Sequence, residues 1–316
     1  MLRRTFLRRL AELAVVLFGV SIIVFLMIRL IPGDAVTIML GANTEITPDR
    51  VAELRHQLGL DQSFFVQYAT WVGAALQGDL GTSLWTGKPV TEEIISSLWP
   101  TLELTFLGLL LGAGLSVPIG CLMAQTRGGR LDVGLRVGAI VGLTIPSFWL
   151  GIVMLVLVSM LLPTFHSLGY VPFTTDPIGN LERMALPVFA VSLPVLANLS
   201  RLVRSAMLDA LGQDYIRTAR AKGASELVVV YKHALRNALI PFVTSVGILT
   251  GYLLGGAIVV EQVFAIPGLG RLILGAIADR NYPLIQATIL MVTVGFVGVN
   301  FVVDLLYRLI DPRIEA

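Results

Sequence analysis

Residues 213–237 read QDYIRTARAKGASELVVVYKHALRN, a polar and basic stretch in a chain of 316 residues that is 55% hydrophobic and only 14% charged. Soluble domains carry roughly 25% charged residues, so the composition as a whole predicts a membrane protein. The net charge of +2 gives no bias toward a nucleic-acid partner. A single cysteine, Cys121, excludes an intrachain disulfide. The polar stretch therefore needs an explanation of its own.

The stretch has the pattern of two short amphipathic helices separated by a glycine. A helical pattern from about residue 208 ends at Gly223, where we expect the left-handed conformation that stops many helices. Ser225 is a candidate N-cap of a second helix, with Glu226 in its first turn, where a negative charge suits the helix dipole. The pattern predicts a hairpin over about residues 208–237. The expected apolar face of its second helix is Leu227, Val230, Tyr231, Ala234, Leu235 and Ala238.

Six apolar runs surround this hairpin, and a bilayer span needs roughly 20 apolar residues. The fourth run is the weakest, because Pro187 and Pro194 interrupt it, and Pro118 and Pro146 predict kinks in the second and third. The six runs cover about residues 10–31, 100–124, 137–162, 186–206, 238–260 and 284–306.

Lysine and arginine gather on one side of these runs. With a cytoplasmic N-terminus, 16 of the 23 basic residues fall on the cytoplasmic side. This asymmetry predicts that both termini are cytoplasmic and places the hairpin in the cytoplasm, between the fourth and fifth spans. The predicted organisation is an N-terminal tip and first span (1–31), an extracytoplasmic segment (32–99), a five-helix core carrying the hairpin (100–310) and a cytoplasmic tail (311–316).

The extracytoplasmic segment contains two predicted short amphipathic helices. The first begins at Thr47-Pro48, an N-cap followed by proline at the first helical position, and stops at Gly59. The second covers Ser63 to Leu76 and carries an aromatic stripe that suits either packing or the membrane–water interface. The aromatic residues are Phe64, Phe65, Tyr68 and Trp71, and Val72 lies at the same helical spacing.

Patterns typical of catalytic or metal sites are absent from the sequence. Residues 81–88 resemble a phosphate-binding loop, but five residues separate the glycines and Pro89 replaces the required serine or threonine. Few ionisable residues fall within the spans; Glu103 and Glu261 lie near outer ends, which weakens the case for ion-coupled transport. We expect no catalytic residue, metal site or cofactor in this chain. The energy for uphill transport would then come from a partner or an ion.

The basic residues of the hairpin allow two interpretations. They can serve only as the positive-inside signal that sets topology. Alternatively, the hairpin can be a docking element for a cytoplasmic partner. A topology signal needs arginines but does not need a capped pair of helices, so the pattern favours docking.

Residues 214–223, DYIRTARAKG, resemble the EAA-type cytoplasmic loop of ABC importer permeases, in the version of the dipeptide/oligopeptide/nickel group. The general loop has Glu-Ala-Ala where this chain has Arg217, Thr218 and Ala219, and Leu235-Arg236 stands where it has Leu-Pro. The peptide-group permeases share these changes, so contacts of the general motif's glutamate do not carry over. Other stretches agree in order along the chain: GDLGTSL (78–84), PTLELT (100–105), IPSFWLG (145–151), HALRNALIP (233–241), VVEQVFAIPGLGRL (259–272), DRNYPLIQ (279–286) and VDLLYRLIDPRI (303–314).

The resemblance implies an all-α integral membrane protein with the six-helix fold of type I ABC importer permeases, in a bacterial or archaeal plasma (inner) membrane. The chain resembles the first of two permease subunits and would itself be no enzyme. Implied partners are a second homologous permease, two cytoplasmic ATPase subunits that carry ATP and magnesium, and an extracytoplasmic substrate-binding protein. The residues implied to couple to the ATPases are Tyr215, Arg217, Thr218, Ala219, Lys222, Gly223, Ala224 and Ser225.

The substrate is left open by the sequence. Peptides are the main expectation for this group, and nickel chelates, glutathione and sugars are alternatives. Ser192, Asn198 and Asn300 are polar candidates for lining a pathway. Two hypotheses from other classes remain at this point, namely an ion-coupled secondary transporter or channel and a membrane anchor without a pathway.

Overall fold

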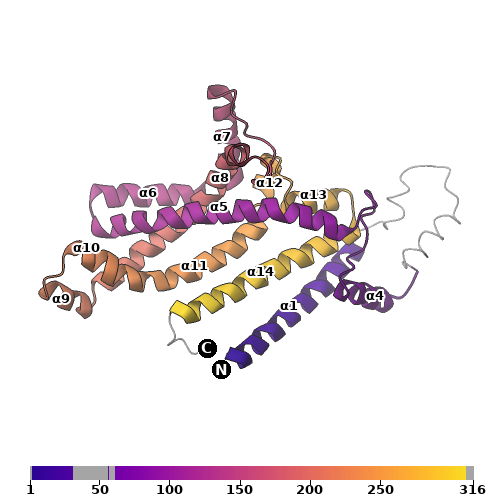
Figure 1. Ribbon diagram of the computed structural model, residues 1–316, viewed down its shortest axis with the longest axis horizontal. Helices are drawn as coiled ribbons and strands as arrows, with labels where there is room; N and C mark the ends of the chain where they lie inside the picture. Colours follow the sequence, from indigo (N-terminus) through magenta and orange to yellow (C-terminus); the bar gives the residue numbers. More distant parts are fainter. Residues whose placement is uncertain (1, 31–55, 57–60, 311–316) are drawn as a thin grey trace. The chain divides into compact units, whose positions relative to one another are not determined.

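The computed structural model describes residues 2–30, 56 and 61–310, and helices dominate this part of the chain (Figure 1). The chain divides into two compact units. The first unit comprises residues 1–99 and 268–297, and the second unit comprises residues 100–267 and 298–316. The helices are α1 (Leu2–Leu30), α4 (Phe64–Leu76), α5 (Val90–Gln125), α6 (Arg130–Thr144), α7 (Ser147–Leu161), α8 (Pro177–Leu211), α9 (Asp214–Ala221), α10 (Glu226–Val228), the π-helical η1 (Val229–Ala234), α11 (Leu235–Gly256), α12 (Ile258–Val263), α13 (Leu269–Ala278) and α14 (Tyr282–Ile310).

Within the described residues the predicted spans fall on helices, but two of them are interrupted. The span 137–162 is broken between α6 and α7, and the span 238–260 is broken at Ala257 between α11 and α12. Among the described residues, four helices are long and apolar enough to cross a membrane, and α6 with α7 makes a fifth candidate bent by 99°. Pro146 causes the break, because proline lacks an amide N–H and forces the preceding Ile145 into extended backbone. The kink predicted at Pro146 is confirmed. The six-helix count and the cytoplasmic location of both termini stay predictions.

Helix α8, expected to be the weakest span, is the best buried of the candidate spans. Its 35 residues begin at Pro177, and the carboxylate of Asp176 accepts a hydrogen bond from the N–H of Gly179 at 3.0 Å. Aspartate at the N-cap followed by proline is a strong start signal that the sequence reasoning missed. Pro187 and Pro194 lie inside α8, which continues through both. Likewise α5 continues through Pro118.

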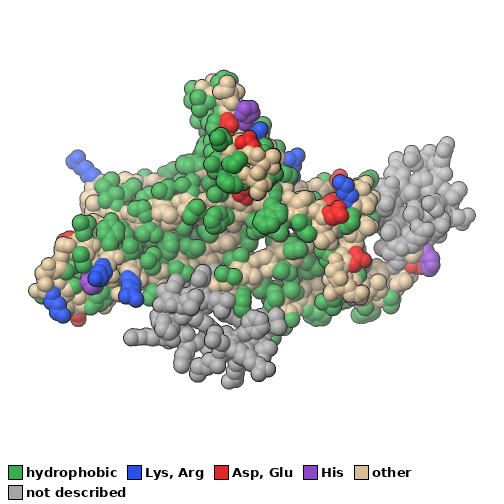
Figure 2. Space-filling model, viewed as in Figure 1, with side chains coloured by type: hydrophobic (Ala, Val, Ile, Leu, Met, Phe, Trp, Pro, Cys, Tyr) green, Lys and Arg blue, Asp and Glu red, His purple; other side chains and the backbone are tan. Residues whose placement is uncertain are grey.

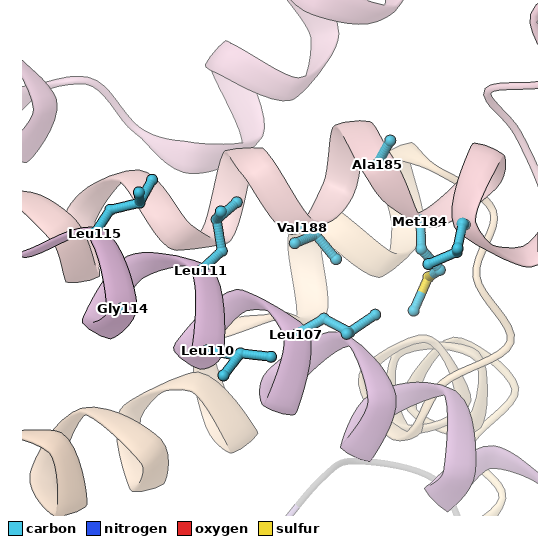
Figure 3. A pocket seen from close by; sticks show the side chains of 9 residues that line it. Leu107, Leu110, Leu111, Gly114, Leu115, Met184, Ala185 and Val188 are labelled. Carbon is cyan, nitrogen blue, oxygen red and sulfur yellow. The ribbon is translucent and has the colours of Figure 1, made fainter.

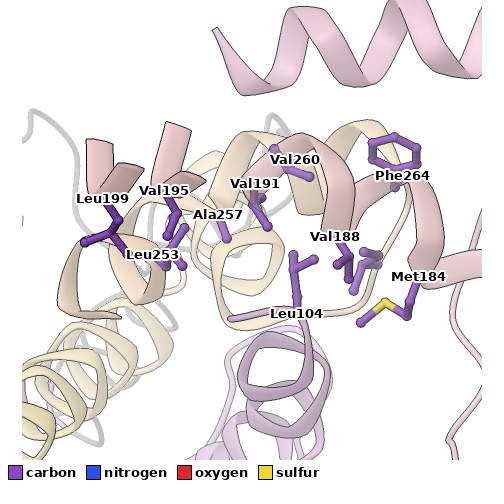
Figure 4. Close-up of a cluster of buried hydrophobic side chains, with 11 residues drawn as sticks. Leu104, Met184, Val188, Val191, Val195, Leu199, Leu253, Ala257, Val260 and Phe264 are labelled. Atoms are coloured by element: carbon purple, nitrogen blue, oxygen red, sulfur yellow. The ribbon is translucent and has the colours of Figure 1, made fainter. Parts of the chain in front are cut away.

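The apolar core of the second unit is centred on α8. Val188, Val191 and Val195 of α8 pack with Leu104 of α5 and with the segment around α12, where Phe264 is fully buried (Figure 4). Burying a side chain of this size away from water stabilises a fold by about 1.5–3 kcal/mol. In lipid, close van der Waals packing between the helices is what stabilises such a core. This core fixes α5, α8 and α12 to one another.

Glycines of α5 allow its backbone to approach α8 closely. A Cβ atom added at Gly112 would lie 2.8 Å from the carbonyl oxygen of Ser192, and one at Gly120 would lie 2.6 Å from Cβ of Val203. A Cβ atom at Gly134 or Gly138 of α6 would meet nothing within 4 Å. Gly112 and Gly120 of α5 are therefore required by packing within this chain, whereas Gly134 and Gly138 of α6 are not.

In the first unit, α4 packs on α1 through part of the aromatic stripe. The hydroxyls of Tyr68 and Ser21 are 2.8 Å apart, and the rings of Tyr68 and Trp71 contact Phe25 of α1. Phe64 and Phe65 are exposed, so only the C-terminal part of the stripe serves this packing. The helix predicted over residues 47–59 lies outside the described residues, apart from His56.

The loop that superficially resembles a phosphate-binding loop has a structural task in the first unit. It closes on itself through a bridge between Thr82 and Pro89. The buried Asn281, in the turn between α13 and α14, donates to the Ser83 hydroxyl at 2.7 Å. Trp85 donates its indole N–H to the carbonyl of Asp279 at 2.8 Å. These bonds attach the loop to the start of α14.

Candidate functional site

Gly223 ends α9 in the left-handed conformation, with φ of +80°. The N–H of Ala224 donates to the carbonyl of Ala219 at 3.2 Å, and the N–H of Gly223 donates to the carbonyl of Arg220 at 2.9 Å. These are the two bonds of a Schellman motif, which requires a positive φ at the glycine. The predicted conformation of Gly223 is confirmed.

The second half of the hairpin is helical, as predicted, but part of it is a π-helix rather than an α-helix. Helix α10 has three residues and is followed by the π-helical η1. Because π-helical bonds span five residues, the segment turns less per residue than an α-helix, and the buried face shifts. Val229 is fully buried, whereas Leu227 and Tyr231, both expected on the apolar face, are 70% and 49% exposed.

Apolar contacts attach the hairpin to the ends of two spans. Ile216 of α9 and Val229 and Val230 near the start of η1 are buried. They pack against Cys121 near the end of α5 and Met207 near the end of α8. Figure 1 shows α9 and α10 at the end of α11 that is away from α12. A force on the hairpin is therefore applied directly to the ends of α5 and α8.

Polar contacts hold the two halves of the hairpin together. The guanidinium of Arg220 donates to both carboxylate oxygens of Glu226, at 2.8 and 3.1 Å. This hydrogen-bonded carboxylate raises the pKa of Arg220 above its already high ordinary value. The amide of Asn237 donates to the hydroxyl of Tyr215 at 2.7 Å. Both pairs are exposed and contribute little stability; the first joins α9 to α10 and the second joins α9 to α11.

Most of the residues predicted to couple to the ATPases lie on the solvent-exposed surface of the hairpin. Arg217, Thr218, Lys222, Gly223 and Ser225 are exposed, and Tyr215 is 40% exposed. Figure 2 shows Lys and Arg side chains gathered over this end of the second unit. Ala219 and Ala224 are half-buried and instead pack against the apolar cluster beneath the hairpin.

The sequence reasoning missed the apolar part of this surface. Leu227, Val228 and Tyr231 are exposed beside the basic residues and form what we call the apolar patch. An α-helical periodicity puts Leu227 and Tyr231 inside, and no residue type in the sequence marks a π-helix. Arginines beside exposed apolar and aromatic side chains are typical of protein-binding surfaces.

Two of the three predicted pathway residues, Ser192 and Asn198, lie on α8, and the third lies on α14. Ser192 is buried, and its hydroxyl donates to the carbonyl of Phe189 in its own helix at 3.0 Å. Asn198 is exposed on α8, and the side chain of Asn300 lies outside the described residues. The pathway role of Ser192, like that of Asn198 and Asn300, stays a prediction.

A cavity of about 470 Å³ lies between α5 and α8. Figure 3 shows leucines of α5 beside Met184 and Val188 of α8, and Ala185 of α8 also contributes to the lining. Its lining offers apolar surface almost throughout, whereas a peptide needs partners for its amide and terminal groups. This cavity is therefore not suited to a peptide.

Two carboxylates near the outer ends of spans are used inside the fold. The hydroxyl of Thr101 donates to Glu261 at 2.6 Å, and Glu261 is fully buried. The hydroxyl of Tyr170 donates to Glu103 at 2.7 Å. Burial raises the pKa of Tyr170, which stays a hydrogen-bond donor. These contacts connect α5 with α12 and with the segment before α8.

Two family models cover nearly the whole chain. Residues 116–316 match "Binding-protein-dependent transport system inner membrane component", and residues 1–105 match the N-terminal model of such components. The Di/tripeptide transport system permease protein DppB of Pseudomonas aeruginosa is 38% identical, over 98% of this chain and 97% of the relative. The Oligopeptide transport system permease protein AppB of Bacillus subtilis is also 38% identical, over 95% of each chain.

Among solved structures, a chain of the inward-facing MetNI methionine ABC transporter superposes with a TM-score of 0.57 and 21% identity. The match covers 70% of this chain and 97% of that chain. At this identity the likeness shows the fold, and it confirms an all-α fold of the ABC importer permease kind. Together with the family models and the relatives, this shows that the chain belongs to the binding-protein-dependent transport system inner membrane components.

Proposed function

We propose that this chain is the transmembrane permease subunit of an ATP-driven importer of di- and oligopeptides, and forms half of the translocation pathway. Family membership makes it a permease subunit rather than an enzyme. The names of the relatives from Pseudomonas aeruginosa and Bacillus subtilis support peptides as the substrate class. The observation that carries the coupling role is the hairpin, which joins an exposed basic and apolar surface to the ends of α5 and α8.

In this proposal the partners are a second homologous permease, two cytoplasmic ATPase subunits and an extracytoplasmic binding protein. ATP and magnesium are held by the ATPases, and the binding protein delivers the substrate. Closure of the ATPases displaces the hairpin. Because Ile216 and Val229 are packed against the ends of the spans, the displacement shifts the spans between inward- and outward-facing arrangements.

The test is reconstitution of the complete complex in liposomes, with the binding protein outside and ATP inside. Uptake of radiolabelled trialanine is compared with uptake of a nickel–histidine chelate and of glutathione. We expect ATP-dependent uptake of trialanine that requires the binding protein. ATP-dependent uptake of one of the other probes alone would keep the coupling role and reject peptides. Uptake by the permeases alone, driven by an ion gradient, would reject ATP-driven import.

The apolar patch gives a prediction for docking. Leu227→Ser removes an exposed side chain, so the stability of the chain is expected to stay within about 0.5 kcal/mol. If Leu227 is buried against an ATPase, the change should lower recovery of the ATPases with the permease severalfold, because a central apolar contact contributes about 1–2 kcal/mol or more.

Co-purification in detergent measures this recovery. Leu162→Ser is the matched control, because Leu162 is a similarly exposed leucine at the end of α7, outside the hairpin. Equal recovery of the ATPases with both variants would contradict a docking role for Leu227.

A further inference from the structure

The carboxylate of Asp132, in the first turn of α6, is fully buried. Arg204 of α8 forms a bidentate ion pair with this carboxylate. Its Nε donates to Oδ1 at 2.8 Å and its Nη2 donates to Oδ2 at 2.9 Å. The N–H of Gly128, in the turn before α6, donates to Oδ2 at 3.0 Å, and Nε of Arg136 lies 3.3 Å from Oδ1. One side chain thus joins the α5–α6 turn to α8.

The Asp132–Arg204 pair lies close to the point where the hairpin continues from α8. Arg204 is about two turns before the end of α8 at Leu211, roughly 10 Å along the helix axis. The same turns of α8 carry Val203 and Met207, against which the hairpin packs. The apolar cluster beneath the hairpin and the Asp132–Arg204 pair therefore hold the same two turns of α8.

Neither a role in setting membrane topology nor a contribution to the stability of the fold accounts for the buried Asp132–Arg204 pair. A topology signal needs only a charge in the aqueous layer, as at the exposed Arg201 one turn earlier in α8. A buried ion pair is a poor source of stability, because desolvation offsets much of the attraction between the charges. A bidentate arginine–carboxylate pair does fix relative orientation, since both of its hydrogen bonds must be kept at once.

We propose that Asp132 is a positioning residue for energy coupling. Through Arg204 it fixes the last two turns of α8 against the start of α6, so that displacement of the hairpin moves α6 together with α8. Without the pair, the hairpin moves α8 alone, and ATP is hydrolysed with less transport. This inference rests on the proposed function.

The measurement is the number of probe molecules transported per ATP hydrolysed by the complete complex in liposomes. The probe is whichever of trialanine, nickel–histidine and glutathione the wild-type complex transports. Asp132→Asn keeps an acceptor for Gly128 but loses the charge. It should lower the ratio at least about fivefold, the lower end of typical coupling between sites, while ATP hydrolysis continues. Arg204→Lys keeps the topology charge but loses the fork, and should lower the ratio as well.

The matched control is Arg201→Gln, which removes an exposed arginine of α8 and should leave the ratio unchanged. If the pair acts as one unit, Asp132→Asn combined with Arg204→Gln should be no worse than the more severe single change. A wild-type ratio in Asp132→Asn, or effects of the two changes that multiply, would overturn the proposal.

Assembly is checked by recovery of the ATPases with each variant. If the Asp132→Asn complex does not assemble, the Arg204→Lys variant is the test of the proposal. An unchanged ratio of transported probe to hydrolysed ATP in that variant overturns the proposal. A wild-type complex that does not couple ATP hydrolysis to uptake rejects the proposed function itself. A coupled wild type with an equally coupled Asp132→Asn rejects only the role of Asp132.

Discussion

Gly223→Glu is expected to leave the chain inserted in the membrane and to abolish most ATP-dependent uptake. At φ of +80° a residue with a Cβ atom is strained by roughly 1–2 kcal/mol. A Cβ at this position would meet no atom within 4 Å, so the strain comes from the backbone alone. Relief of the strain breaks the Schellman bonds and changes the angle between α9 and α10. The new carboxylate also places a negative charge beside Lys222 on the proposed docking surface.

Two further substitutions separate these causes. Gly223→Asn should retain most uptake, because asparagine tolerates the left-handed conformation. Gly223→Ala introduces the strain without the charge and should fall between the two. The measurements are probe uptake and ATP hydrolysis by the reconstituted complex. Wild-type uptake with Gly223→Glu would be incompatible with a coupling role for the hairpin.

Gly112→Ala is expected to destabilise the second unit strongly. The new methyl group would lie 2.8 Å from both the carbonyl oxygen of Ser192 and Cβ of Val195, and the first of these is backbone that cannot rotate away. Overpacking of this kind costs about 1–3 kcal/mol. Separation of α5 from α8 also loosens the core around Val191 and Leu104.

Gly114→Ala is the matched control for this prediction, because Gly114 is in the same helix and a Cβ there would meet nothing within 4 Å. Both variants receive the same methyl group and the same gain in helix propensity, which favours alanine over glycine by about 1 kcal/mol. The thermal midpoint of the purified permease in detergent should fall for Gly112→Ala and stay or rise for Gly114→Ala. Equal midpoints would show that α5 and α8 do not pack through Gly112.

Local chemistry made much of the hairpin predictable. Gly223 after a basic amphipathic turn and Ser225 before Glu226 indicate a stop and a start, and the structure has α9 ending and α10 beginning there. Ser225 has the extended backbone of an N-cap, although its side chain makes no capping hydrogen bond. Backbone conformation is set by neighbours in the sequence, so it can be inferred without the tertiary structure.

The burial of side chains in the hairpin could not be predicted in the same way. Leu227 and Tyr231 follow an α-helical apolar pattern, but the π-helical turn of η1 exposes them and buries Val229. A π-helix forms where tertiary packing favours the shifted face, and no residue between 229 and 234 marks it. The apolar patch of the docking surface is therefore a product of the fold.

By itself, the sequence determined the membrane class, the order of the helices, the break at Pro146 and the left-handed turn at Gly223. Each of these depends on composition or on contacts within a few residues. Only the tertiary structure decided that Asp132 meets Arg204, that Gly112 faces α8 while Gly114 does not, and that Ser192 is buried. These properties depend on the rotation of each helix about its axis, which is fixed by packing between segments far apart in the chain.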